Sequence, residues 1–417
     1  MPTMQGQILT STESSLMTSN KQNIVLLNGE LKIRPYVDNE QLKEIVLQCF
    51  GLELDGDSEP VEMVSYDDRN FRIKGKLKGQ DETKQFVLKI FNSGSASKGV
   101  LESVVKLMSH CASKSMGGFA VQTPVPSIKS NGEDAPQFIA SYHIPVLGEA
   151  CYDGCTKEKL INKGLLSVGE NNVVTCSHDI RLVTFLEGKV PDYSKENCSD
   201  TFAEDTGRTC ANLCNAMLDV PQFKDVDRTG WIWDLLSCGK ILKNSCLNVI
   251  KDMALKKVLE DVINEFESKT IPELDKHFTK SYIHGDLNEQ NLLISNEDKV
   301  AGILDFDDVV WSYPVIDLAT SMMYLSVGCS EKDMIHKLNM MYKGYNSIRK
   351  LSEVEKSLLF NICLMRYAQS TSVSIYQHEV IDPTNDYLLL HTKNNFQKMS
   401  FLIGLGPDEF MKRVCSE

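Results

Sequence analysis

The chain has 417 residues, and its 44 lysines and arginines stand against 57 aspartates and glutamates, which gives a formal net charge of −13. This acidic balance disfavours binding to nucleic acid or to anionic membranes through bulk charge. No stretch reaches the roughly 20 apolar residues of a membrane span, and the N-terminus has neither the basic start nor the apolar middle of a secretory signal. We therefore expect a cytoplasmic protein of two lobes with no nucleic-acid or membrane partner, and its oligomeric state stays open.

The 13 cysteines are scattered without regular spacing. The closest pairs are Cys151 with Cys155 and Cys210 with Cys214, and neither forms the C-x-x-C pattern typical of zinc or redox sites. An odd number of cysteines in a chain long enough to build a large core does not indicate a disulfide framework. We predict reduced, mostly buried thiols.

Residues 1–24 are rich in serine, threonine, glutamine and asparagine and show no periodicity, which predicts a mobile tail. A helix should follow, capped by Asp38 or Asn39 and ended by Gly51, because apolar residues recur there at helical spacing. These apolar residues are Leu42, Ile45, Val46, Cys49 and Phe50.

The next segments, FRIKGKLKG and KQFVLKIF, alternate with a period near two. They predict an antiparallel hairpin with its turn at residues 79–81. A second helix is predicted over about 98–111, and further strands are predicted near 126–129 and 179–186.

Residues 132–178 are weakly periodic and longer than a plain connection, so we interpret them as an insertion of unknown role. The pattern changes from strand-rich to helix-rich at about Gly188. We therefore expect a nucleotide-binding N-lobe over 25–187 and a helical C-lobe, with the catalytic loop and substrate site, over 188–417.

The segment most informative about chemistry reads HGDLNEQN from His284 and is followed by DFDD from Asp305. Each follows or precedes short strand-like stretches, so a strand–loop–strand hairpin would bring Asp286, Asn291 and Asp305 together. Two carboxylates and an amide oxygen suit Mg²⁺, which takes one or two carboxylates together with phosphate oxygens. Phosphoryl transfer needs such a set, because one acid must orient the attacking hydroxyl while other ligands hold the metal on the nucleotide.

These motifs resemble the H-x-D-x-x-x-x-N loop and the metal-binding aspartate of the aminoglycoside phosphotransferase and choline kinase family, whose members phosphorylate small molecules. Protein kinases read H-R-D and D-F-G at these places. Within the family, the blocks SYDDRNFRI, IRLVTFLEGK, ILDFDDVVWSYPVIDLA, CLMRYAQS and NDYLLLHTK are similar to the hydroxylysine kinases and span about residues 40–400. The resemblance implies a bilobal, protein-kinase-like α+β fold with a small antiparallel-sheet N-lobe and a larger helical C-lobe.

The resemblance also implies roles for the residues of the two motifs. Asp286 would be the catalytic base, and Asn291 and Asp305 would be the Mg²⁺ ligands. His284 would support the loop by packing and hydrogen bonding rather than by acid–base chemistry.

The lysine of the second hairpin strand, Lys89, would contact the nucleotide phosphates by the same resemblance. An inward-facing lysine in an apolar strand needs a charge partner, because a lone buried ammonium is costly. Glu102 in the following helix is the expected partner, with Glu62 and Glu82 as rivals. The alternative for Lys89 is a strand residue whose ammonium reaches solvent.

The turn that would cover the phosphates lacks the glycine-rich pattern of protein kinases and offers the polar residues 65–70 instead. Backbone N–H groups and small polar side chains can still bind phosphate there, and we expect Ser65 and Asn70 to contribute. Thr184, Phe185 and Leu186 would form the hinge between the lobes, where backbone groups read the purine edge.

Substrate contacts are expected from residues around the acidic motif. Asp307 and Asp308 suit a cationic acceptor, and Asp307 could instead touch a second metal. Arg366 could bind a substrate carboxylate or form an ion pair inside the C-lobe. Trp231 could line the cleft or belong to the core, and Asp317 is interpreted as a helix cap or as an anchor of the catalytic loop.

The resemblance implies transfer of the γ-phosphoryl group of GTP to 5-hydroxy-L-lysine, giving 5-phosphohydroxylysine and GDP in lysine degradation, with Mg²⁺ as the cofactor. Two alternatives stay open. One is an ATP-dependent kinase of another amino alcohol, such as choline, ethanolamine, homoserine or an aminoglycoside, because substrates change readily within a fold. The other is a catalytically silent nucleotide-binding module, which the presence of all four expected catalytic residues disfavours.

Overall fold

The structure is a computed structural model that describes residues 24–27, 30–56, 58–63, 65, 68–94, 97–114, 116–128, 136–146, 157–169, 172–191, 198–223, 228–381, 383, 386–389 and 392–416. The chain divides into two compact units, the first reaching to Ser109 and including Gln122–Glu187, and the second formed by His110–Val121 and Gly188–Glu417. The short segment His110–Val121, expected in the N-lobe, thus belongs with the second unit. The expected tail lies outside the described residues except for Ile24.

The first unit is built around an antiparallel sheet with the strand order β3-β5-β6-β10-β8, in which β4 also pairs with β5 and β9 with β10. Strands β1 and β2 form a separate pair. The elements are β1 (Ile24–Leu27), β2 (Glu30–Ile33), α2 (Asn39–Phe50), β3 (Leu52–Leu54), β4 (Val61–Met63), β5 (Arg69–Leu77), β6 (Lys84–Ile90), α3 (Lys98–Ala112, which continues into the second unit), β8 (Ile139–Pro145), α4 (Lys157–Asn162), β9 (Ser167–Val168) and β10 (Val174–Thr184).

Helix α2 confirms the first predicted helix, because its start and stop signals are local. The Asp38 carboxylate accepts a hydrogen bond from the backbone N–H of Gln41, and the Gln41 side chain accepts one from the backbone N–H of Asp38. Gly51 ends the helix in the left-handed conformation, with φ 62°. All five apolar residues named above are buried.

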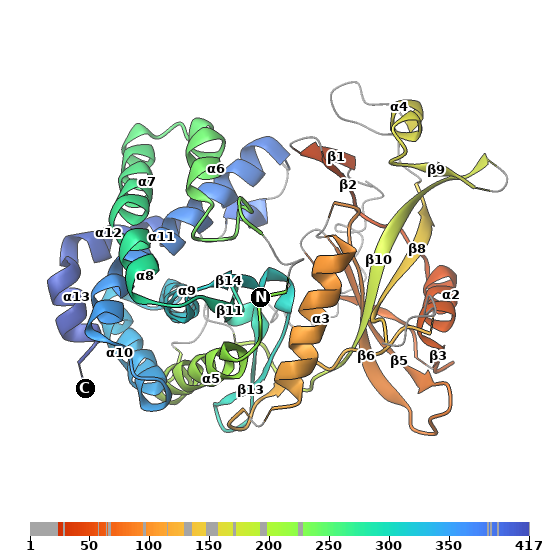
Figure 1. Ribbon diagram of the computed structural model, residues 1–417, viewed down its shortest axis with the longest axis horizontal. Coiled ribbons are helices and arrows are strands. Elements are labelled where there is room, and N and C mark those ends of the chain that lie inside the picture. Colours follow the sequence, from red (N-terminus) through yellow and green to blue (C-terminus); the bar gives the residue numbers. More distant parts are fainter. Residues whose placement is uncertain are drawn as a thin grey trace. The chain divides into compact units, whose positions relative to one another are not determined.

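The predicted hairpin is confirmed as β5 and β6, whose register places Asn70 opposite Lys89. Alternate residues of β6 face opposite sides of the sheet. Leu88 and its same-face neighbours pack in a core with α2, whereas Phe91 packs with Leu101 of α3. The two helices therefore cover opposite faces of the sheet (Figure 1), and Lys89 points to the α3 side.

Two expectations for this unit are wrong. Residues 126–129 form no strand where they are described, and only an isolated bridge joins nearby Pro124 to Val183. The supposed insertion 132–178 contains β8, which pairs with β10 in the central sheet from Ile139 onward. Its pairing partner lies about 35 residues further along the chain, so no local pattern revealed it; the other residues of 132–178 lie partly outside the described ranges.

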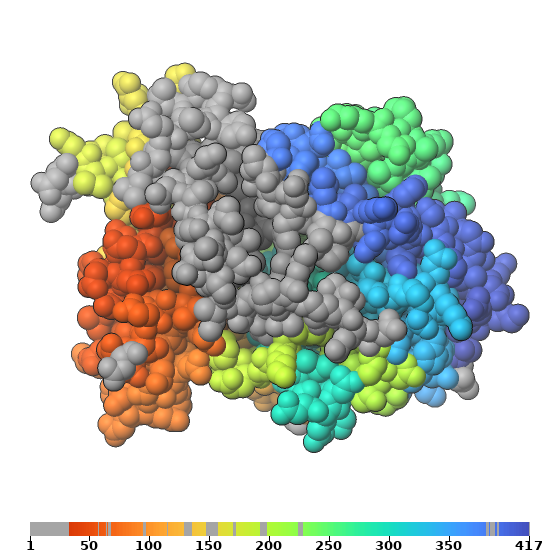
Figure 2. Space-filling view, turned by 180° about the vertical axis from the view of Figure 1, so that it is seen from behind, coloured from red at the N-terminus to blue at the C-terminus, as the bar shows by residue number. Residues whose placement is uncertain are grey.

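The second unit is mainly helical and contains two small sheets, β11 with β14 and β12 with β13 and β7. Figure 2 shows α10 beside the C-terminal helices on one face of this unit. Its elements are β7 (Ala120–Val121), α5 (Asp200–Leu218), α6 (Gly239–Asn244), η2 (Cys246–Asn248), α7 (Met253–Glu265), η3 (Phe266–Thr270), α8 (Ile271–His277), β11 (Ser281–Ile283), η4 (Glu289–Asn291), β12 (Leu292–Ile294), β13 (Val300–Ile303), η5 (Phe306–Asp308), β14 (Val310–Ser312), α9 (Pro314–Val327), α10 (Glu331–Ile348), α11 (Glu353–Tyr376), η6 (Gln377–Ile381), η7 (Asp386–Leu389), α12 (Thr392–Leu405) and α13 (Pro407–Val414).

The predicted state of the cysteines is confirmed for the eleven that the structure describes, since all are free and buried. Cys151 and Cys155 lie outside the described residues. Among the described residues, no helix combines the length and the apolar character that crossing a bilayer requires.

Candidate active site

The loop that follows β11 holds Asp286, and its carboxylate is fixed from two sides. One oxygen accepts a hydrogen bond from the guanidinium of Arg366 at 2.8 Å. The other accepts from the side-chain amides of Asn288 at 2.7 Å and Asn291 at 3.1 Å. Both oxygens of Asp286 therefore have a defined orientation in the second unit.

Asp317, in the first turn of α9, anchors the backbone just before Asp286. Its carboxylate accepts from the N–H of His284 at 2.7 Å and from the N–H of Gly285 at 2.9 Å, and its side chain is fully buried. Burial raises the pKa of Asp317, and His284 and the two N–H groups oppose that rise. The contacts agree with the structural interpretation of this residue as an anchor of the loop.

The loop lies directly against the DFDD segment. The buried ring of His284 approaches the carbonyl of Leu304 at 2.9 Å and packs edge-on against Phe306. Gly285 has φ +80°, and a Cβ atom placed on it would lie 2.2 Å from the carbonyl oxygen of Asp308. Glycine is required here for both its backbone conformation and its lack of a side chain.

The residues expected to hold a metal carry suitable oxygens. The Nδ2 group of Asn291 donates to the Asp286 carbonyl and carboxylate, which leaves the Asn291 Oδ1 oxygen as the atom available to a cation. Asp305 adopts the rare left-handed conformation at φ 50°. Within the described residues, no three histidine, cysteine, aspartate or glutamate side chains form a metal-binding group. A cation would therefore need the Asn291 oxygen and oxygens from a ligand as well as carboxylates.

The DFDD segment has an excess of negative charge. Burial, together with the charges of Asp286 and Asp305, raises the pKa of Asp308 to about 8, and Arg228 offsets part of that rise. Where neighbouring carboxylates disfavour one another's charged form, a bound cation would be stabilised. This observation fits a divalent metal at the segment.

Arg228 was missed by the sequence analysis. Its guanidinium donates to the backbone carbonyl of Asp307 at 2.5 Å and lies 4.3 Å over the ring of Trp231. Trp231, expected to line a cleft or fill the core, is half-buried and supports this arginine. The DFDD segment that Arg228 contacts lies about 80 positions further along the chain, so no spacing pattern pointed to this arginine.

Arg366 does not have the open position expected of a group that binds a substrate carboxylate. It is 2 % exposed and lies between the rings of Trp233 and Tyr324, 5.5 and 5.4 Å from their centroids. Its second nitrogen donates to Gln369 at 2.7 Å. The alternative interpretation, an ion pair inside the helical unit, is the one the contacts support, and the partner is Asp286.

We expect Arg366→Met to lower kcat by about 10- to 100-fold while nucleotide affinity stays unchanged, because a charge-assisted hydrogen bond to the base is lost. Methionine keeps an unbranched side chain between the two rings. Steady-state kinetics on Arg366→Met, Asp286→Asn and the double variant would check this. If Arg366 acts through Asp286, its replacement adds little to the loss in Asp286→Asn; additive losses would contradict the interpretation.

In the first unit, Lys89 has a different partner from the one expected. Its ammonium lies 3.3 Å from the carboxylate of Asp68, and both side chains are largely buried. Glu102 instead accepts hydrogen bonds from the backbone N–H groups of Phe138 and Ile139, at 3.2 and 2.9 Å. The expected Lys89–Glu102 pair is therefore wrong, because the Glu102 carboxylate accepts hydrogen bonds from the backbone at the start of β8 instead. The hairpin register could have indicated Asp68, because it places Asn70 opposite Lys89 and Asp68 lies two residues before Asn70, on the same side of the strand.

Three neighbouring strands bring polar side chains together around Lys89. The register places Asn70 on one side of Lys89 and Arg181 on the other. The Oδ1 atom of Asn70 is buried without a hydrogen-bond partner. Ser65, also expected here, is half-buried, and no contact found among the described residues joins it to Asn70, Lys89 or Arg181.

The expected purine-reading segment ends the first unit, and much of its backbone is already hydrogen-bonded. The N–H of Thr184 donates to the carbonyl of Thr123 at 2.9 Å, and the N–H of Phe185 donates to the backbone carbonyl of Gln85 at 3.1 Å. Among the described hydrogen bonds, none involves the N–H of Leu186. Of the three residues, Leu186 thus retains a backbone donor for a ligand.

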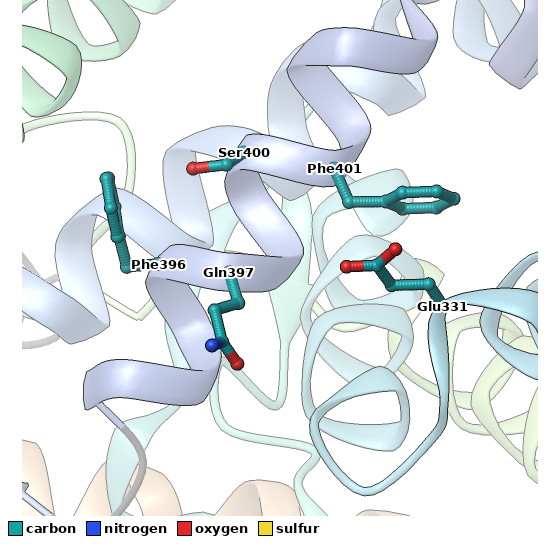
Figure 3. A pocket seen from close by; sticks show the side chains of 5 residues that line it. All are labelled: Glu331, Phe396, Gln397, Ser400 and Phe401. Carbon is teal, nitrogen blue, oxygen red and sulfur yellow. The ribbon is translucent and has the colours of Figure 1, made fainter.

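Two surface hollows have linings that include none of these residues. One, of about 530 Å³, is formed by Glu331 of α10 and by residues of α12, including Phe396 and Phe401 (Figure 3). The other lies along α2 and β3 in the first unit. None of the candidate residues lines either hollow, so the candidate site rests on the contacts described above.

Comparison with known proteins places this arrangement among phosphotransferases. Residues 65–335 match the family model described as the phosphotransferase enzyme family. Curated relatives include a hydroxylysine kinase of Xenopus laevis, 26% identical over 409 residues, covering 95% of this chain and 96% of the relative. A hydroxylysine kinase of Danio rerio is 24% identical over 387 residues, covering 91% and 95%.

Solved structures confirm the expected kinase-like α+β fold. A microcompartment-associated aminopropanol kinase is 12% identical with a TM-score of 0.58, covering 88% of this chain and 95% of its own. An amicoumacin kinase solved with AMP-PNP and Ca²⁺ is 11% identical with a TM-score of 0.58, covering 90% and 94%. Choline kinase from Cryptosporidium parvum is 13% identical with a TM-score of 0.52, covering 89% and 99%.

Proposed function

Because this chain belongs to the phosphotransferase enzyme family, we propose that it transfers the γ-phosphoryl group of GTP to the hydroxyl group of 5-hydroxy-L-lysine, yielding 5-phosphohydroxylysine and GDP. The observation that carries the proposal is the fixed carboxylate of Asp286, held by Arg366 and two asparagine amides in a loop that packs against the DFDD segment. The naming of the curated relatives as hydroxylysine kinases supports the acceptor. The choice of GTP rather than ATP as the phosphoryl donor rests on the same similarity to hydroxylysine kinases.

The chemistry is an in-line displacement at the γ-phosphorus. The acceptor hydroxyl oxygen forms a bond to the γ-phosphorus, the bond from that phosphorus to the β–γ bridging oxygen breaks, and GDP leaves. The hydroxyl proton passes to the Asp286 carboxylate. Since Arg366 and the two amides orient the carboxylate before substrate binds, little reorganisation is needed when the hydroxyl arrives.

Asn291 and Asp305 would hold the metal, and the charge around Asp308 supports a divalent cation there. When bound, Mg²⁺ neutralises charge that develops on the transferred phosphoryl group. The residues of this chain meanwhile fix the loop: Asp317 binds its backbone, and His284 packs beneath it.

Nucleotide contacts are proposed for the first unit. Lys89 would bind phosphate oxygens, with Asp68 holding its ammonium in place. Asn70 would add its side chain, and the free backbone donor of Leu186 would contact the purine. We do not propose Glu102 as a nucleotide-site residue, because its carboxylate is hydrogen-bonded to the backbone of β8.

The proposal is tested by following nucleoside diphosphate release with Mg²⁺ and either GTP or ATP. The acceptors are 5-hydroxylysine, lysine, choline, ethanolamine and homoserine, each also assayed with the Asp286→Asn variant. We expect release with GTP and 5-hydroxylysine that disappears in the variant and on removal of Mg²⁺ with a chelator.

Other outcomes would change the conclusion in defined ways. Release with a different alcohol would keep the kinase and discard hydroxylysine as the acceptor. Release with ATP alone would discard GTP. Nucleotide binding in a thermal-shift assay, with no release for any acceptor, would favour the silent nucleotide-binding module.

A further inference from the structure

We propose that Arg228 binds the carboxylate of an α-amino-acid acceptor, so that the enzyme selects amino acids over amino alcohols that lack a carboxylate. This inference rests on the proposed function and deepens it by assigning the part of the site that recognises the acceptor. It transfers to Arg228 the role that Arg366 cannot fill.

The first argument is position. The Arg228 guanidinium donates to the carbonyl of Asp307 at 2.5 Å. The next carbonyl, that of Asp308, lies against Gly285, where an added Cβ atom would be only 2.2 Å away. Gly285 precedes Asp286. Arg228 therefore binds the same short backbone segment that packs against Gly285, the residue before the proposed base, and all of these residues belong to the same unit.

The second argument is availability. A guanidinium carries five N–H donors. One hydrogen bond, to Asp307, is found for Arg228 among the described residues, and its side chain is only half-buried. The indole of Trp231 lies 4.3 Å from the guanidinium and stacks on one of its faces, so ligand hydrogen bonds would be made by the N–H groups in the guanidinium plane. Those groups match the two oxygens of a carboxylate. Arg366, by contrast, is 2 % exposed and bonded to Asp286 and Gln369.

The third argument is charge. An α-amino acid carries a carboxylate and an ammonium group on the same carbon, so its recognition needs a cation and an anion close together. Arg228 provides the cation, and the acidic DFDD segment whose backbone it binds provides negative charge close to it. Choline and ethanolamine carry an ammonium alone and would leave the arginine without a counter-charge.

Binding measurements test the proposal without relying on turnover. L-Lysine has the carboxylate but no acceptor hydroxyl, and cadaverine is the same molecule without the carboxylate. Calorimetry on the full chain with Mg²⁺ and a non-hydrolysable nucleotide should show that Arg228→Gln weakens lysine binding by about 10- to 100-fold and leaves cadaverine binding unchanged. Arg228→Lys should fall between, because it keeps the charge and loses the fork. Arg413→Gln, which removes an exposed arginine of α13, is the matched control.

Turnover provides the second readout. For 5-hydroxylysine, KM should rise in Arg228→Gln by a similar factor with kcat little changed, whereas 1,5-diaminopentan-2-ol should show no rise. Equal effects on both molecules of either pair, or no effect, would overturn the assignment of Arg228. If neither alcohol is phosphorylated by the wild type while the lysine-specific loss of binding is seen, the proposed function fails and the carboxylate site stands.

Discussion

Replacing Asp286 with asparagine is expected to lower kcat by about 10²- to 10⁴-fold, the usual contribution of a general base. Asparagine has nearly the same shape, and its one oxygen can still accept a hydrogen bond from Arg366, although its amide nitrogen cannot accept from Asn288 and Asn291. Asp317 still binds the backbone N–H groups before it, so the loop should keep its structure. The introduced asparagine cannot take the proton of the acceptor hydroxyl. Steady-state kinetics would measure the loss, and nucleotide affinity should stay within about twofold because the phosphate contacts are proposed for other residues.

The matched control for this variant is Asp408→Asn, which changes an exposed aspartate in the first turn of α13. It should have the activity of the wild type. If Asp286→Asn kept most of its kcat, Asp286 would be a structural residue and the chemistry would need another base. If it lost nucleotide binding as well, the loop would contribute to the nucleotide site directly.

Replacing Asp317 with alanine is expected to lower the free energy of unfolding by about 2–5 kcal/mol, because two buried N–H groups lose their acceptor. These are the N–H groups of His284 and Gly285, so activity should fall with stability as the base loses its fixed backbone. Asp317→Asn keeps one of the two acceptor oxygens and should show a smaller loss. Chemical denaturation followed by circular dichroism would measure both variants.

Asp408→Ala again supplies the control, since it removes an acidic side chain from a first helical turn that is exposed. It should change stability by less than about 0.5 kcal/mol. A fully stable Asp317→Ala with low activity would show that the aspartate acts on the chemistry and not on the loop. A stable and active variant would show that the loop is held by its other contacts.

Elements with local signals were predictable from the sequence. The helix from Asn39 to Phe50 has its cap, its apolar face and its terminating glycine within 14 residues, and the β5–β6 hairpin has its turn between its strands. Strand β8 was not predictable in the same way, because its place is decided by pairing with β10. The surrounding segment resembled an insertion since a strand at the edge of a sheet needs no strong apolar pattern.

The candidate site shows the same division. The catalytic loop could be read from HGDLNEQN because its polar residues lie within eight positions of one another. The partners of these residues could not, because Arg366 and Arg228 lie far along the chain from Asp286 and Asp307. For Lys89, the family resemblance and the nearness of the next helix in the chain favoured Glu102, yet the ion pair is formed with Asp68. Sequence patterns identified the chemical groups, and tertiary contacts decided which charges pair.

The ion pair between Asp286 and Arg366 also sets an order in time. The two residues are 80 positions apart, and a ribosome adds about 5–20 residues per second, so the arginine is synthesised about 4–16 s after the aspartate. During that interval the nascent chain contains the entire HGDLNEQN loop, including the two asparagines that bind one oxygen of its acid, while the arginine that binds the other oxygen is missing. A message truncated between the two codons would therefore yield a protein that carries every residue of the catalytic motif and lacks the arginine that pairs with its acid.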